Sequence, residues 1–288
     1  MKTIISGDLH SRWAKARRMY VKAGLIKTTS DDPFDDVRQP GFRHVQLGDA
    51  VSLGYGEVEA NFYRWLFDVV GVDNALVGNH ELPALFHSPN DVMFNGWYDK
   101  SEIQRELDRD FPRGQGDFWA KGYPWRTGRD REAEILVRDK YREGRYEVAT
   151  HVGDWLVTHA GIAARHQKKL GLQGASAEFI AAYLNRAFEH SMEHGTNEEF
   201  LTGCSEGRGG IMWLRFDYLR NGYDNDTSDL PQIVGHTGYL GPKLYGSRLW
   251  NIDTPAPSKQ AGGKAELGGT ACLVTPDDGE TFDLIYEA

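Results

Sequence analysis

The sequence predicts a layered α/β fold, and three observations support this prediction. Residues 2–6, 43–47 and 73–77 are short runs rich in Val, Ile and Leu and bounded by glycine, a pattern typical of buried strands. The segment at residues 57–70, between the second and third runs, carries apolar residues at helical spacing. Because a single α/β domain reaches about 250 residues, the 288-residue chain indicates one domain, 1–288, with an insertion.

The remaining elements follow along the chain. Residues 86–147 mix charges, glycines and tryptophans without a long period, so we expect an inserted cap with short helices there. Residues 146–161 predict a hairpin that turns at Gly153 and Asp154. An amphipathic helix is expected to begin at Ser176 and to run to residue 194. Four later strands are predicted at residues 232–238, 249–254, 270–275 and 281–287.

Composition restricts the class of protein. Hydrophobic content of 40% and charged content of 26% are those of a soluble globular chain. The net charge of -9 disfavours a long basic surface, so nucleic acid is not an expected partner. No apolar run approaches the roughly 20 residues of a membrane span, and the first residues form a strand rather than a signal peptide, so a cytoplasmic protein is expected. Cys204 and Cys272 form neither a metal-ligand spacing nor a disulfide framework.

Six side chains with metal-binding groups stand at or just after the ends of apolar runs, and four of them directly follow a glycine. The six are Asp8, His10, Asp49, Asn79, His159 and His236. Parallel α/β sheets gather such strand ends on one side. This mixed set of oxygen and nitrogen donors, with one carboxylate able to bridge, suits two divalent transition-metal ions about 3.5–4 Å apart.

Five short motifs carry a family resemblance. "GDLH", "GDAV", "GNHE", "THAG" and "GHTG" occur in this order on predicted strand ends, and they resemble the calcineurin-like metallophosphoesterases. Similarity is greatest to the branch of serine/threonine protein phosphatases and bacterial diadenosine tetraphosphatases, over residues 1–81 and 154–255, and "MWLR" and "NIDT" resemble later segments of bacterial and phage members. The resemblance implies a metallophosphoesterase-type β-sandwich of mixed sheets flanked by helices.

The resemblance also implies roles for individual residues. Asp8 and His10 would hold the first ion, Asp49 would bridge, and Asn79, His159 and His236 would hold the second ion. His80 would stand over the leaving group and donate a proton to it. Phosphate would be contacted by Arg215, then in order of preference by Arg208 or Arg12. The ions would be two divalent metals, Mn²⁺ before Fe or Zn²⁺.

The implied activity is metal-dependent phosphohydrolysis by a bridging hydroxide. Substrates would be phosphomonoesters, on a phosphoprotein or a small molecule, or nucleotide polyphosphates. The second motif departs from the GDxVDRG of the protein phosphatases, because Ser52 and Leu53 stand where an Asp orients the catalytic histidine and an Arg grips phosphate. The last motif, "GHTG", lacks the second histidine of GHxH and agrees with the protein-phosphatase branch.

Two interpretations from different classes follow. Retention of all six ligands and of His80 favours an enzyme, whereas the substitutions at Ser52 and Leu53 favour a binding module that has kept the fold and lost catalysis. Glu81 either orients a neighbour or caps a helix, and the sequence does not separate these roles. The histidines without motif context are interpreted as structural or surface groups, and these are His44, His87, His151, His166, His190 and His194.

Overall fold

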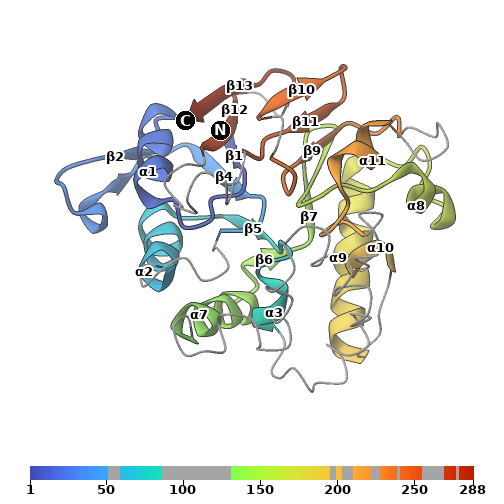
Figure 1. The fold of residues 1–288 in the computed structure, drawn as a ribbon, viewed down its shortest axis with the longest axis horizontal. Helices are drawn as coiled ribbons and strands as arrows, with labels where there is room; N and C mark the ends of the chain where they lie inside the picture. The colour runs from blue at the N-terminus through green and yellow to red at the C-terminus, as the bar shows by residue number, and fades with distance from the viewer. Residues whose placement is uncertain are drawn as a thin grey trace, which may run out of the picture.

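The chain folds around two mixed β-sheets with helices outside them in the computed structural model (Figure 1). The structure describes residues 1–50, 59–85, 131–194, 199–202, 210–221, 228–238, 241–254, 269–276 and 279–288.

The first sheet has six strands in the order β13-β12-β1-β4-β5-β6. Its strands are β1 (Lys2–Ser6), β4 (Phe42–Gln46), β5 (Asn74–Leu76), β6 (Tyr146–Glu147), β12 (Thr270–Thr275) and β13 (Asp283–Glu287). Strands β1, β4, β5 and β6 run parallel, while β12 is antiparallel to both β1 and β13. The three predicted N-terminal strands are therefore confirmed, and they lie side by side with their carboxyl ends at one edge.

The second sheet has five strands in the order β10-β11-β9-β8-β7. Its strands are β7 (Ala149–Val152), β8 (Trp155–Thr158), β9 (Gln232–Val234), β10 (Lys243–Tyr245) and β11 (Leu249–Asn251). Strands β8, β9 and β11 are parallel neighbours, whereas β7 and β10 are antiparallel edge strands. A separate two-stranded sheet pairs β2 (Ile26–Lys27) with β3 (Val37–Arg38).

The predicted hairpin at residues 146–161 is confirmed in part. Strands β7 and β8 form it and turn at Gly153 and Asp154, but Tyr146 and Glu147 pair with β5 in the first sheet instead. Residues 146–152 therefore contribute a strand to each sheet, because the chain crosses from the first sheet to the second at Val148. Sequence periodicity cannot show such a crossing, since both parts have an extended backbone.

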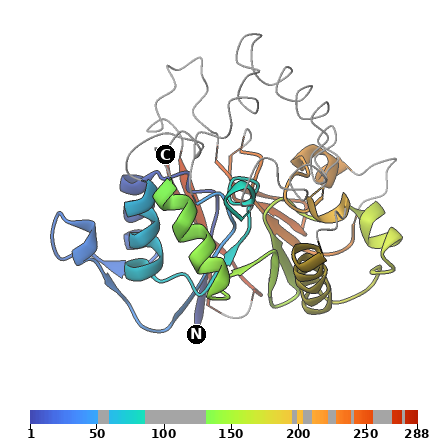
Figure 2. The same cartoon turned by 90° about the horizontal axis from the view of Figure 1, so that it is seen from below.

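Helices cover the outer faces of both sheets. On the side of the first sheet lie α1 (Trp13–Lys22), α2 (Glu59–Arg64), the π-helical turns η2 (Trp65–Val70), α3 (Leu82–Leu85) and α7 (Arg131–Arg142), while the 3-10 turn η1 (Pro33–Asp35) lies between β2 and β3. On the side of the second sheet lie α8 (Ala164–Lys169), α9 (Ala177–His194), α10 (Glu199–Thr202) and α11 (Phe216–Asn221). Figure 2 shows α2 and α7, in cyan and green, on the opposite side of the strands from α9. Ser176 begins α9 as predicted, with its hydroxyl accepting a hydrogen bond from the Phe179 N–H at 3.2 Å.

Alternating side chains of β1 show how the layers are held together. Ile4 packs with the apolar cluster under the helices, whereas Ile5 packs with Val45, Val157 and Ile233 between the two sheets. Side chains from both sheets fill this inner cluster, so the sheets pack face to face. This arrangement confirms the predicted sandwich of mixed sheets flanked by helices.

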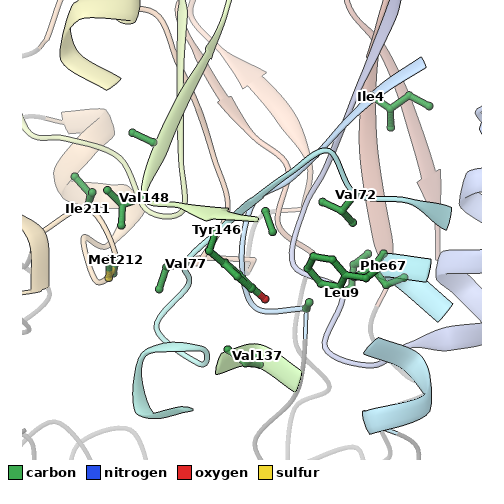
Figure 3. Packing of buried hydrophobic residues seen from close by; sticks show 14 of the residues in the cluster. Ile4, Leu9, Phe67, Val72, Val77, Val137, Tyr146, Val148, Ile211 and Met212 are labelled. Atoms are coloured by element: carbon green, nitrogen blue, oxygen red, sulfur yellow. The ribbon is translucent and has the colours of Figure 1, made fainter. Parts of the chain in front are cut away.

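The end of the predicted insertion joins the main layers. Val137 of α7 and Tyr146 of β6 are buried in the cluster that contains Ile4 and Phe67 (Figure 3). Residues 131–147 thus pack against the first sheet, while residues 86–130 lie outside the described residues, so the cap stays a prediction. No helix in the described part of the chain combines the length and the apolar character needed to cross a membrane.

Candidate metal centre

The predicted ligands gather where the parallel strands of both sheets end. Asp8 and His10 follow β1, Asp49 follows β4 and Asn79 follows β5, while His159 and His236 follow β8 and β9 of the second sheet. Such carboxyl ends of parallel strands are the usual place for a ligand in open α/β sheets. All six predicted ligands lie among the described residues, and the distances given below show that they meet.

Three of them form a compact group around the amide of Asn79. Its Oδ1 lies 3.0 Å from Nε2 of His159 and 2.9 Å from Nδ1 of His236. Nδ1 of His159 donates to the carbonyl of Leu47 at 2.9 Å, so Nε2 of this neutral ring carries a lone pair. Two acceptors then face each other at about 3 Å, which is the separation expected of two adjacent ligands of one ion with bonds of about 2.1 Å.

Asp49 belongs to two groups of potential ligand atoms. His10, Asp49 and His80 offer atoms that all lie within 4.8 Å of one another, and so do Asp49, His159 and His236. Its Oδ2 is 3.6 Å from Nε2 of His159 and 3.7 Å from Nε2 of His80. A carboxylate in this central position is able to serve two ions.

The side chain of Asp8 is almost completely buried, whereas that of His10 is partly exposed. Its Oδ2 is 4.0 Å from Nε2 of His10 and accepts the His236 N–H at 3.0 Å. Oδ1 of Asp8 and Nε2 of His236 are buried, and neither has a hydrogen-bond partner among the described residues. Buried polar atoms are nearly always satisfied, so these two atoms fit ligands of a cation.

Backbone strain is concentrated at the same place. In the described part of the chain, positive φ outside glycine occurs at His10 (46°), Ser11 (54°), Asp49 (51°) and His236 (67°). Three of these are predicted ligands and Ser11 is adjacent to one. Strained backbone of this kind clusters at functional sites, where the surrounding structure fixes an unfavourable conformation.

Two glycines of the motifs are required because a carboxylate lies very close to the backbone at each of them. A Cβ at Gly235 would fall on Oδ1 of Asp8, and a Cβ at Gly78 would fall on Oδ1 of Asp49. No side chain fits at either position, because the carboxylates of neighbouring motifs occupy the space. The glycines therefore let the ligand-bearing loops pack directly against one another.

The electrostatics of the centre favour added positive charge. Burial, followed by the charges of Asp253 and Asp49, raises the pKa of Asp8, and burial with the charge of Glu81 raises the pKa of Asp49. Burial also lowers the pKa of His159 to about 3, so this imidazole is neutral at pH 7. Neutral imidazoles and carboxylates that need positive charge nearby are the donor forms that divalent metals bind. The residues present therefore fit a divalent metal centre.

The three candidate arginines have different positions. Arg215 is half-buried and lies just before α11. Burial lowers the pKa of His236, and the charge of Arg215 is the second cause of this shift. Arg12 is buried and donates to Oγ1 of Thr254 at 2.9 Å and to the carbonyl of Gly269 at 2.5 Å. Arg12 thus ties two later segments to the start of α1. Arg208 lies outside the described residues, as do Ser52 and Leu53.

Two buried carboxylates lie beside the predicted ligands: sequence reasoning missed Asp253 and left the role of Glu81 open. Asp253 follows β11 and raises the pKa of Asp8, while the carboxylate of Glu81 contacts the loops that carry Asp49 and Asn79. Asp253 is within "NIDT" and Glu81 within "GNHE", so the motifs contained both residues without revealing their contacts.

Among the described residues, none of the histidines without motif context belongs to the two groups of potential ligand atoms, and His87 lies outside the described residues. His44 is buried and forms a polar cluster with Ser6 and Tyr20, with Nε2 at 3.0 Å from the Ser6 hydroxyl. The rings of His190 and His194 stack on the exposed side of α9 with their centroids 4.2 Å apart. Two surface hollows of about 600 and 400 Å³ share Asp229 and Arg248 and lie at the opposite, amino-terminal ends of β8 and β9. None of the six predicted metal ligands lines either hollow.

Comparison with known proteins gives a likeness in fold. No protein-family model and no curated relative matches the sequence. The structure is similar to a cold-active protein-tyrosine phosphatase of a Shewanella species, with 15% identity, a TM-score of 0.53, and coverage of 99% of this chain and 80% of that chain. This likeness shows the fold alone, and it agrees with the predicted sandwich of mixed sheets flanked by helices.

Two weaker likenesses concern the predicted branch. A protein named as a candidate diadenosine tetraphosphatase matches with 14% identity and a TM-score of 0.49, over 100% of this chain and 94% of that chain. A serine/threonine phosphatase of Saccharomyces cerevisiae matches with 13% identity and a TM-score of 0.46, over 100% and 79% of the two chains. With TM-scores under 0.5, neither likeness carries an argument.

Proposed function

We propose that this protein is a metal-dependent phosphohydrolase with a dinuclear centre. The observation that carries the proposal is the position of Asp49, whose carboxylate belongs to both groups of potential ligand atoms at the carboxyl ends of the strands. Asp8 and His10 complete one site, and Asn79, His159 and His236 complete the other. Divalent ions held by these residues would supply the Lewis acidity that makes water a nucleophile and neutralises phosphoryl oxygens.

The histidines at the opening would handle the substrate. The side chains of His10 and His80 are 18% and 15% exposed, whereas those of Asp49 and His159 are almost completely buried. Substrate therefore approaches from the side of His10 and His80. In this proposal His80 would protonate the leaving oxygen and Arg215 would bind the phosphate.

The substrates proposed are phosphomonoesters, on small molecules or phosphoproteins, and nucleotide polyphosphates. All of these present a phosphoryl group to the two ions, and the rest of each molecule lies outside this common chemistry. Mn²⁺ is the first metal to try, because carboxylate, amide and imidazole donors together suit it, and Fe and Zn²⁺ follow.

Metal counting combined with a rate assay tests the proposal. Wild-type protein reconstituted with Mn²⁺ should bind two ions per chain and hydrolyse p-nitrophenyl phosphate, and a chelator should abolish the hydrolysis. Asp49→Asn should weaken both ions and abolish turnover, because one carboxylate serves both sites. One tight ion in the wild type that Asp49→Asn leaves unchanged would contradict the dinuclear centre.

The ion count needs its own control. His190 and His194 are exposed and stand one turn apart on α9, an arrangement that by itself can attract transition-metal ions. The measurement is therefore repeated in the double variant His190→Asn/His194→Asn, which should keep two ions and full activity. The alternative, a binding module without catalysis, predicts bound ions with no hydrolysis of any phosphate ester.

A further inference from the structure

Glu81 connects the two loops that carry the central ligands. Its buried carboxylate accepts three backbone hydrogen bonds, from the N–H groups of Asp49 at 2.8 Å, Ala50 at 2.9 Å and Gly78 at 3.0 Å. Asp49 and Ala50 belong to the loop after β4, whereas Gly78 belongs to the loop after β5. One side chain thus holds the backbone of both loops.

The loops need this connection because strand pairing stops before them. The register of β4 and β5 ends with Gln46 opposite Ala75, so Asp49 and Gly78 lie beyond the last strand-to-strand pair. Buried N–H groups that have left a ladder must find other acceptors. The two carboxylate oxygens of Glu81 accept three of these N–H groups. They replace the strand-to-strand hydrogen bonds that end at Gln46 and Ala75.

The connection is reciprocal. Oδ1 of Asp49 accepts the His80 N–H at 2.9 Å, so Asp49 holds the loop of Asn79 and His80 while Glu81 holds the loop of Asp49. Gly78 lacks a side chain at the point where both carboxylates approach, since a Cβ there would contact Asp49 and would lie 2.8 Å from Oε2 of Glu81. The three groups therefore fix one relative position of the loops.

A helix-capping role does not account for these contacts. The following helix, α3 (Leu82–Leu85), is a single turn, and the three hydrogen bonds given above go to residues that precede it. Of the two roles left open by the sequence, the structure supports the orientation of neighbours.

We propose that Glu81 is a positioning residue that sets the distance between Asp49 and the pair Asn79 and His80, so that both ion sites exist before ions bind. This inference rests on the proposed function, because it treats Asp49 and Asn79 as metal ligands. Outer groups that orient metal ligands typically change metal affinity or activity by about 10–100-fold when they are replaced.

The test compares Glu81→Gln with wild type. Glutamine keeps the shape but offers one acceptor oxygen, so at least one of the three N–H groups faces an amide nitrogen. Calorimetric titration of the metal-free protein with Mn²⁺ should show both ions weakened by about 10–100-fold. For p-nitrophenyl phosphate at saturating Mn²⁺, kcat should fall while KM changes little. Amide hydrogen exchange at Asp49, Ala50 and Gly78 should become faster in the metal-free variant.

A matched control separates positioning from general stability. Asp36 is also buried and accepts hydrogen bonds from Arg17 and from the Trp65 indole, away from the centre. Asp36→Asn should lower the Tm and leave Mn²⁺ affinity and kcat unchanged. Where Glu81→Gln does not fold, Glu81→Asp serves instead, because it keeps the charge, shortens the reach, and should give a smaller loss of Mn²⁺ affinity.

The outcomes distinguish the two proposals. If wild type binds two ions and Glu81→Gln binds them with the same affinity, Glu81 has no positioning role and the proposed function is untouched. If Glu81→Gln lowers the Tm alone, as Asp36→Asn does, Glu81 is structural and the inference is overturned. If wild type itself binds no divalent ion, both the inference and the proposed function fail.

Discussion

Acid should destabilise this protein partly through one core histidine, His44. Its side chain is fully buried, and burial lowers its pKa to about 3 from an ordinary value near 6.5. In the unfolded chain the imidazole takes up a proton as the pH falls below about 6.5, while in the folded protein it stays neutral. Stability contributed by neutral His44 is therefore present above that pH and is lost as the pH falls from 6.5 towards 3.

The size of the effect follows from this difference. One pKa unit corresponds to about 1.4 kcal/mol, so lowering the pH from 7 to 5 should remove about 2 kcal/mol of unfolding free energy through His44. His44→Gln has no titrating group and should lose about 2 kcal/mol less than wild type between these pH values. At pH 7 the variant should also be less stable than wild type, because Ser6 and Tyr20 lose their imidazole partner.

Urea unfolding at pH 7 and pH 5 in the presence of a chelator measures the difference. The chelator removes the effect of bound ions, and comparing the change with pH rather than the stability itself cancels the packing defect. His194→Gln, which removes an exposed imidazole, is the control for the loss of a histidine as such. Equal losses in wild type and His44→Gln would refute the reasoning.

Two further predictions concern the reaction. His80→Asn should slow hydrolysis of an alkyl phosphate by about 10²–10⁴-fold but that of p-nitrophenyl phosphate distinctly less, because nitrophenolate leaves without a proton; equal losses, or loss of metal, would contradict the role of proton donor. Arg215→Ala should lower kcat/KM by about 10–100-fold, as expected for a lost charge-assisted contact of about 1.5–3 kcal/mol, with Mn²⁺ content unchanged. An unchanged kcat/KM in steady-state assays would show that Arg215 forms an ordinary ion pair instead.

Much of the first sheet could be predicted because its strands carry a strong local signal. The predicted runs 2–6, 43–47 and 73–77 correspond to β1, β4 and β5 with shifts of only a few residues, since each run is short, apolar and followed by a glycine turn. The strands of the second sheet were harder to predict from the sequence. Its strands β10 and β11 are three residues long, and β10 was not predicted because "KLY" is too short to show alternation.

In the candidate site, too, some residues could be predicted from the sequence and others could not. Asp49 is predicted as a ligand by the set of five motifs in sequence order, and each motif is a local pattern that the sequence shows directly. The contacts of Arg12 could not be predicted, because its acceptors at Thr254 and Gly269 are more than two hundred positions away and are defined only by the fold. Local patterns thus identify groups that point into a site, whereas the groups that hold them depend on tertiary packing.

The strained backbone and the buried carboxylates have one common explanation. Positive φ at His10, Asp49 and His236 costs about 1–3 kcal/mol each, and the buried carboxylates of Asp8 and Asp49 repel their acidic neighbours. A fold does not retain such a concentration of unfavourable terms at one point unless the surrounding structure and a ligand offset them. Divalent ions bound only by the folded chain would do so, because they stabilise the native state in proportion to their affinity. The proposed dinuclear centre would therefore explain why these backbone conformations and these carboxylates occur together at one place.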